Sequence, residues 1–266
     1  MFGVNVIGER LEITTRIGCP VGCSKYCPQD VLVPNYKSEQ KVLTLANFKA
    51  ALTTVPKNVE VVFSGFCEPF SNKSAIDMIE YAYQQGYPVR LFTTLHQAER
   101  SDVERLIKLR LKEFCLHLPD GENMNIPVTE EYMANVFKVI RNVRNLSIMS
   151  MNDRFRSDNR ENVVRGLETK RRRVGYCTNF EAPQFVLLPN GSLQLCCRDF
   201  GLWHTVGNLL KENYTTVRNR FVRQKKNYRL CSLCDANTSR IHMVTIKAFT
   251  AFRRKIKFQI TDQFIR

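Results

Sequence analysis

Three cysteines early in the chain could hold a metal centre. Cys19, Cys23 and Cys27 lie four residues apart within residues 18–28, here called the cysteine loop, directly after a strand-like segment at residues 11–17. Thiolates bind iron–sulfur clusters, and three of them on one tight loop leave one iron of a four-iron cluster open to another ligand. A structural zinc site is the alternative, although zinc sites usually combine cysteine pairs from two places.

The segments that must position this loop alternate in character. Expected strands cover residues 11–17, 59–63, 88–93, 113–118 and 146–151, and expected helices cover residues 43–55, 71–84, 101–111 and 129–143. This alternation predicts βα units around a parallel sheet. A complete barrel takes about 250 residues, which leaves no room for a second module. We therefore predict an α/β fold, a partial (incomplete) TIM-like βα barrel, with the cysteine loop at the C-terminal end of its first strand, where ligands gather.

Helix boundaries carry signals of their own. Thr44 and Ser101 are candidate N-caps, because their hydroxyls can accept a hydrogen bond from the first helical turn. Gly86 marks the end of the helix expected over residues 71–84, because glycine tolerates the left-handed conformation that often follows a helix.

The character of the sequence changes after about residue 170. Residues 185–195 hold two apolar runs around an Asn-Gly pair, which is a strong hairpin signal, and Cys196 and Cys197 follow it. The pair Cys231-x-x-Cys234 comes later. We predict a small C-terminal β-hairpin module that is stapled by a cluster. The expected domains are residues 1–170 (partial barrel), 171–240 (hairpin and cluster module) and 241–266 (basic tail).

Composition narrows the cellular setting. The chain has ten cysteines, no secretory signal and no apolar run long enough to span a membrane. Disulfides are rare in the cytosol, so metal or cluster ligation explains these cysteines better. We expect a cytoplasmic protein without a transmembrane segment.

The chain is strongly basic, with a formal net charge of +15. This charge predicts an acidic partner, such as an anionic or phosphorylated substrate, or else only a solvated basic surface. Nucleic acid is a weaker expectation, because no aromatic-rich binding platform accompanies the charge. The basic segment 245–266 would pack on its own domain or lie on an anionic membrane.

Three patches in this order resemble the radical S-adenosylmethionine enzymes. The first is the cysteine loop, in which Tyr26 precedes the last cysteine and one residue more than usual precedes that cysteine. The second, residues 63–70, is similar to the family's Gly-Phe-Gly-Glu-Pro turn, with Cys67 in place of a glycine. The third is the cysteine-rich tail, which resembles the twitch variant of the SPASM domain. The resemblance covers roughly residues 10–235.

The resemblance implies cofactors and a chemistry. Cys19, Cys23 and Cys27 would hold a 4Fe–4S cluster whose open iron binds S-adenosylmethionine. Reduction by a donor such as flavodoxin or ferredoxin would generate a 5′-deoxyadenosyl radical, which takes a hydrogen atom from the substrate.

The resemblance also implies where S-adenosylmethionine binds. Tyr26 would pack beside the adenine, or have a plain packing role. In the turn after the second strand, the expected cofactor-binding residues are Ser64, Gly65, Phe66, Cys67 and Glu68. Glu68 would order that turn. At the ends of the third and fourth strands, the expected residues are Thr93, Thr94 and His117. A hydrogen-bonded core histidine is the alternative for His117.

The twitch-like tail implies a second, auxiliary 4Fe–4S cluster, which would carry electrons and not bind substrate. Its expected ligands are Cys177, Cys196, Cys231 and Cys234. Cys197 is the alternative to Cys196, and only one should be a ligand, because neighbours on a hairpin face opposite sides. A redox-active pair is the alternative for Cys231 and Cys234. Cys115 is expected to be a buried apolar thiol.

Arg160 is the candidate catalytic residue. Asn159-Arg160 is similar to the Asn-Arg-Gly-Gly segment of twitch-type aminocyclitol dehydrogenases, without the glycines. Arg160 would contact the substrate or assist removal of a proton, and a surface arginine is the alternative.

These expectations combine into one leading function. The chain would be a dehydrogenase-like radical S-adenosylmethionine oxidoreductase that takes hydrogen from a hydroxylated small molecule, such as a sugar, an aminocyclitol or a nucleotide-linked alcohol. The electron left behind would pass to the auxiliary cluster. A maturase that modifies a ribosomal peptide and a non-catalytic iron–sulfur RNA-binding protein are the alternatives.

Overall fold

The computed structural model describes residues 8–23, 27–119, 124–150, 159–164, 166–168, 170, 177, 182–224 and 228–234. The strands are β1 Arg10–Ile13, β2 Glu60–Phe63, β3 Val89–Thr93, β4 Glu113–Leu118, β5 Leu146–Ser150, β6 Gln184–Leu187, β7 Ser192–Gln194 and β8 Thr205–Asn208. The helices are α1 Gln29–Asn35, α2 Leu45–Leu52, the short 3₁₀ helix η1 Pro69–Ser71, α3 Ala75–Gln84, α4 Arg100–Leu106, α5 Glu130–Asn142, α6 Tyr214–Gln224 and α7 Arg229–Leu233. The expected alternation of strands and helices up to residue 151 is confirmed.

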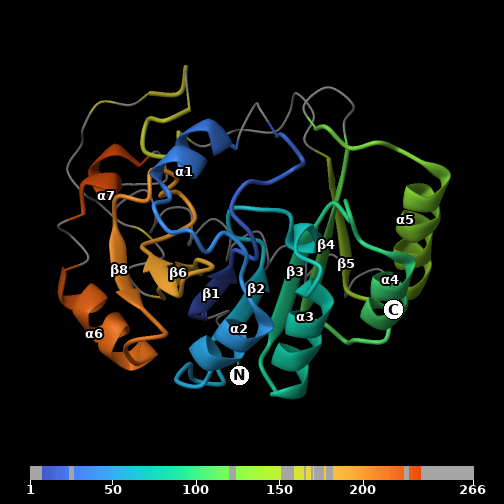
Figure 1. The fold of residues 1–266 in the computed structure, drawn as a ribbon, viewed down its shortest axis with the longest axis horizontal. Coiled ribbons are helices and arrows are strands. Elements are labelled where there is room, and N and C mark those ends of the chain that lie inside the picture. Colours follow the sequence, from blue (N-terminus) through green and yellow to red (C-terminus); the bar gives the residue numbers. More distant parts are fainter. Residues whose placement is uncertain are drawn as a thin grey trace, which may run out of the picture.

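One open sheet of eight strands runs through the described chain, in the order β5-β4-β3-β2-β1-β6-β7-β8 (Figure 1). The six strands from β5 to β6 are parallel, whereas β7 and β8 are antiparallel to their neighbours. Because β5 and β8 lie at opposite ends, the sheet does not close. This is the incomplete barrel that the sequence predicts.

The C-terminal hairpin is continuous with the barrel sheet. Its first strand, β6, pairs in parallel with β1, from Arg10 opposite Gln184 to Ile13 opposite Leu187. The hairpin itself is present, since β6 and β7 pair antiparallel across Asn190 and Gly191. The predicted division at residues 170 and 240 stays a prediction.

The strands have an apolar outer face. Alternate residues on a strand point to opposite sides, and the outer set in β1–β3 is fully buried with α2 and α3: Leu11, Ile13, Val61, Phe63, Leu91, Phe48 and Ile79. Each such side chain contributes about 1.5–3 kcal/mol relative to exposure. Helices α2 to α5 follow one another along this face (Figure 1), and α6 extends the cover to β6, where Phe221 meets Phe185 with ring centroids 5.3 Å apart.

The inner face of the sheet is polar at the N-terminal ends of the strands. Glu60 is only 5% exposed and pairs with Arg10 at 3.3 Å, with Arg90 at 2.7 Å, and with Lys112. Arg90 also pairs with Glu113. Burial raises the pKa of Glu60, but the hydrogen bonds and charges of Lys112 and Arg90 outweigh it, so the pKa lies below its ordinary value. This network closes the floor of the barrel.

Two of the three helix-boundary predictions hold. The Thr44 hydroxyl accepts a hydrogen bond from the Asn47 backbone at 3.1 Å, which confirms the N-cap of α2. Gly86 follows α3 with a φ of +79°. Ser101 is not an N-cap, because α4 begins one residue earlier, at Arg100. There the Asp102 side chain accepts a hydrogen bond from the Glu99 backbone at 2.9 Å and closes the first turn instead.

Candidate active site

A cavity of about 400 Å³ lies at the C-terminal ends of β1 to β4. The cysteine loop, the turn after β2, the ends of β3 and β4, and the segment around Arg160 all contribute to its wall. The predicted site residues that line it are Cys19, Cys23, Cys27, Ser64, Gly65, Phe66, Cys67, Glu68, Thr93, Thr94, His117 and Arg160. The fold therefore brings together the predicted residues of the first site. Tyr26 lies outside the described residues, as does the basic tail.

The cysteine loop is tied to the turn through Gln29, the first residue of α1, a helix that the sequence does not predict. The Gln29 amide donates to the Cys27 sulfur at 3.2 Å and to the Phe66 carbonyl at 2.8 Å, and its oxygen accepts from the Cys19 backbone at 3.3 Å. The Glu68 backbone donates to the Cys19 sulfur at 3.3 Å. The sulfur atoms are thus oriented by donors that would also serve thiolates.

The thiols need a positive centre to ionise. Burial, and then the nearby Cys67, raises the pKa of Cys19 well above its usual range, and burial raises the pKa of Cys27. A zinc ion, with Zn–S bonds of about 2.3 Å, would hold thiolates roughly 4 Å apart. Among the described residues, three ligand atoms within 4.8 Å of one another occur at Glu161, Asp199 and His204, and no cysteine trio is that compact. The wider spacing favours a cluster over a single zinc ion.

The turn after β2 lies directly against β1. Gly65 has a φ of +54°, and a Cβ there would meet the Ile13 carbonyl oxygen at 2.8 Å. The Phe66 backbone donates to the Thr14 hydroxyl at 3.1 Å. Gly65 therefore allows the backbone to pass close to β1 and to border the cavity.

Glu68 orders this turn, as predicted. It is buried, and its carboxylate accepts hydrogen bonds from the Thr93 hydroxyl, the Thr94 backbone at 2.7 Å, the Thr94 hydroxyl at 2.8 Å and the Phe70 backbone at 3.3 Å. Burial raises the pKa of Glu68 against the opposing effect of these bonds. Thr93 and Thr94 thus hold Glu68, and any contact with a cofactor would be additional.

Cys67 lies beside the cysteine loop. Its sulfur is 3.4 Å from the Thr15 hydroxyl, and it borders the cavity. Burial raises its pKa, and its charge in turn raises the pKa of Cys19. The replacement of glycine by cysteine therefore adds a fourth sulfur near the three of the loop.

His117 faces the cavity from β4. Its Nε2 is buried and has no hydrogen-bond partner among the described residues. Its ring packs edge-on against Phe92 at 6.2 Å, and burial lowers its pKa. A neutral imidazole with an unused nitrogen that borders a cavity is available to a ligand. The alternative of a core histidine hydrogen-bonded through Nε2 is not what the structure has.

Arg160 also reaches the cavity. Its backbone φ is +45°, its guanidinium donates to the Cys197 carbonyl at 2.9 Å and lies 5.2 Å from the centre of the Phe200 ring. It is half-buried and not the exposed surface arginine of the alternative.

Glu12 is a site residue that the sequence analysis missed. It lies on the inner face of β1, is 8% exposed, and accepts a hydrogen bond from the Ser64 hydroxyl at 3.2 Å. Burial raises its pKa, and the hydrogen bond of Ser64 and the charges of Arg160 and Arg10 oppose the rise. A charged residue between Leu11 and Ile13 of an apolar strand was the available signal.

The four predicted auxiliary ligands also come together. The charges of Cys177 and Cys234 act on Cys231, whose pKa is raised to about 12, first by burial. The charge of Cys234 also acts on Cys196, which is buried. Cys197 instead lines the first cavity and hydrogen-bonds Glu12. The neighbours Cys196 and Cys197 thus face different sites, which favours Cys196 as the auxiliary ligand.

None of the ten cysteines, all of which lie among the described residues, forms a disulfide. In the described part of the chain, no helix is both long enough and apolar enough to cross a membrane.

Comparison with known proteins identifies the fold. No family model matches the chain, and no curated protein matches it. Among solved structures, BtrN in complex with AdoMet and 2-DOIA is 15% identical, with a TM-score of 0.63 over 88% of this chain and 95% of that one. For anSMEcpe with bound AdoMet the values are 14%, 0.54, 94% and 95%. For SuiB of Streptococcus suis, bound to its precursor peptide SuiA, they are 10%, 0.55, 88% and 72%. The chain therefore has the fold of the radical S-adenosylmethionine enzymes, in the form that carries an auxiliary domain.

Proposed function

We propose that the protein is a radical S-adenosylmethionine oxidoreductase that oxidises a hydroxylated small molecule. The observation that carries this proposal is the single cavity into which the three loop cysteines, the Glu68-ordered turn and the pair Glu12 and Arg160 all open. Its volume of about 400 Å³ lies in the range of small-molecule sites.

The residues present fit the cofactors. Cys19, Cys23 and Cys27 are three soft donors on one loop, which suits a 4Fe–4S cluster with one open iron. The buried, unused Nε2 of His117 and the close turn at Gly65 supply polar and backbone contacts for S-adenosylmethionine. When bound, these cofactors supply a 5′-deoxyadenosyl radical that takes hydrogen from a carbon, and an auxiliary cluster on Cys177, Cys196, Cys231 and Cys234 takes up the remaining electron.

Glu12 and Arg160 form the substrate end of the site. Loss of hydrogen from a carbinol carbon must be followed by loss of the hydroxyl proton if a ketone is to form. Glu12 would accept that proton, because burial makes its carboxylate a better base than an exposed one. Arg160 would hold the substrate oxygen, since its guanidinium lies in the same wall.

Product analysis tests the proposal. The protein is reconstituted anaerobically, reduced and mixed with S-adenosylmethionine and a panel of sugars and aminocyclitols that carry deuterium at the carbinol carbons. We expect 5′-deoxyadenosine that contains deuterium, together with a ketone. Cleavage that never transfers deuterium from any alcohol would end the oxidoreductase assignment.

Two controls separate the alternatives. Cys23→Ala should abolish 5′-deoxyadenosine formation, whereas Cys115→Ala, which alters a buried thiol outside the cavity wall, should preserve it. RNA retention that weakens with salt, without any cleavage of S-adenosylmethionine, would indicate the RNA-binding function instead.

A further inference from the structure

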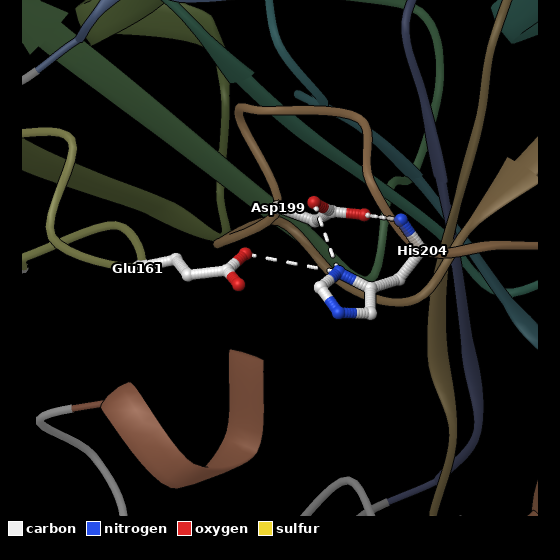
Figure 2. A group of neighbouring side chains, drawn as sticks. All are labelled: Glu161, Asp199 and His204. Atoms are coloured by element: carbon white, nitrogen blue, oxygen red, sulfur yellow. Dashed lines mark hydrogen bonds and ion pairs between the residues drawn. The ribbon is translucent and has the colours of Figure 1, made fainter. Parts of the chain in front are cut away.

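Three side chains meet in a buried group outside the cavity. Glu161 follows Arg160 in the chain, and Asp199 and His204 belong to the loop between β7 and β8. A Glu161 oxygen lies 3.7 Å and an Asp199 oxygen 3.4 Å from His204 Nδ1. Figure 2 shows both carboxylates directed at the imidazole. The three ligand atoms lie within 4.8 Å of one another, and none of these residues lines the cavity.

Glu161 has no structural partner that explains its burial. It is 3% exposed, and no described residue donates a hydrogen bond to either of its carboxylate oxygens. An isolated buried carboxylate is costly, so such groups are paired, protonated or bound to a metal. Arg229 of α7 is exposed and attracts Glu161 without forming an ion pair among the described residues.

Asp199 differs from Glu161. Its two oxygens accept hydrogen bonds from the Trp203 backbone at 3.1 Å and from the His204 backbone at 2.9 Å, so it closes the loop. Each carboxylate oxygen can accept more than one interaction. Asp199 is therefore held rigidly in place, with capacity left on the side that faces His204.

We propose that Glu161, Asp199 and His204 bind one divalent first-row transition-metal ion. Two carboxylate oxygens and an imidazole nitrogen form a donor set that Mn²⁺ and Zn²⁺ accept. Bonds of about 2.0–2.3 Å place neighbouring ligands of one ion roughly 3–4 Å apart, and the separations of 3.4 Å and 3.7 Å match. The excess of carboxylates over soft ligands favours manganese.

Binding requires the lone pair of His204 Nδ1. A proton on that nitrogen therefore leaves to solvent as the ion binds. The other ring nitrogen faces the Leu230 backbone at 3.5 Å, which is long for a hydrogen bond and leaves the tautomer free to change. The competing occupant is a proton, since burial raises the pKa of Glu161 to about 7.

The site is distinct from the expected iron–sulfur centres, because no cysteine contributes to it. It does lie near one of them, since the charge of Glu161 acts on Cys231. The ion would join the segment 159–164, which carries Arg160 into the cavity, to the loop after β7. The inference does not rest on the proposed enzymatic activity.

Titration with Mn²⁺, followed by electron paramagnetic resonance, tests the site. The full chain is used with its iron retained, because Mn²⁺ has little affinity for thiolates. We expect the signal of free Mn²⁺ to disappear up to about one ion per chain. In Glu161→Gln this binding should weaken at least about tenfold. Glu39→Gln removes the same charge from an exposed position and should bind normally.

A second measurement needs no variant. Pulsed resonance of the bound Mn²⁺ should show coupling to one histidine nitrogen, whereas a purely carboxylate site would show none. The absence of a stoichiometric Mn²⁺ site, of nitrogen coupling, or of any difference between Glu161→Gln and Glu39→Gln would overturn the proposal.

Discussion

The turn after β2 approaches β1 so closely that one added methyl group should destabilise the fold. At Gly65, with φ at +54°, a Cβ would lie 2.8 Å from both the Ile13 carbonyl oxygen and the Thr14 nitrogen. The left-handed conformation alone costs about 1–2 kcal/mol for alanine, and overpacking against backbone adds about 1–3 kcal/mol. We expect Gly65→Ala to lower the free energy of unfolding by about 2–5 kcal/mol.

Gly86 is the matched control. Its φ is +79°, and nothing lies within 4 Å of a Cβ built there. Gly86→Ala therefore meets only the backbone penalty of about 1–2 kcal/mol. Urea unfolding of both variants, followed by circular dichroism, gives the difference directly. If Gly65→Ala costs no more than Gly86→Ala, the turn does not lie against β1 as described, and its place in the cavity wall is wrong.

Three further predictions concern the site and the barrel floor. Cys19→Ala should lower the iron content by about four ions per chain, and Cys115→Ala should leave it unchanged; equal iron counts would refute the ligand assignment. Glu12→Gln should slow ketone formation, and the wild-type rate should fall as the pH drops through the raised pKa of Glu12, a limb that the variant should lack in a pH–rate profile. Glu60 has a folded pKa below its ordinary value of 4.5, so its ion pairs stabilise the protein above that pH and lose this effect as the pH falls through the folded pKa. Urea midpoints from pH 7 to pH 3 should therefore depend less on pH in Glu60→Gln, and parallel curves would contradict this.

The sequence predicted those parts of the fold that depend on local pattern. Alternating apolar segments located β1 to β5, and Thr44 and Gly86 marked real helix boundaries. Ser101 misled because the acidic residue next to it, Asp102, closes the first turn of α4 one residue earlier. The parallel pairing of β6 with β1 was not predicted, since a hairpin signal says nothing about the outer partner of its first strand.

The candidate site was predicted where residue types alone carry the chemistry. Cysteines and the Glu68 turn stand out in any sequence, and the fold brings them to one cavity. Glu12 was missed because its importance depends on which face of β1 points inward, and Arg160 gained its role only from the left-handed backbone around it. The group of Glu161, Asp199 and His204 joins positions about 40 residues apart that no local pattern links.

The central claim is that the cysteine loop holds a cluster with one iron open to S-adenosylmethionine. Electron paramagnetic resonance of the anaerobically reduced protein, with and without S-adenosylmethionine, tests it most directly. The account predicts a reduced-cluster signal whose shape changes when S-adenosylmethionine is added, and loss of this response in Cys23→Ala. A signal that ignores S-adenosylmethionine in the wild-type protein would contradict the account.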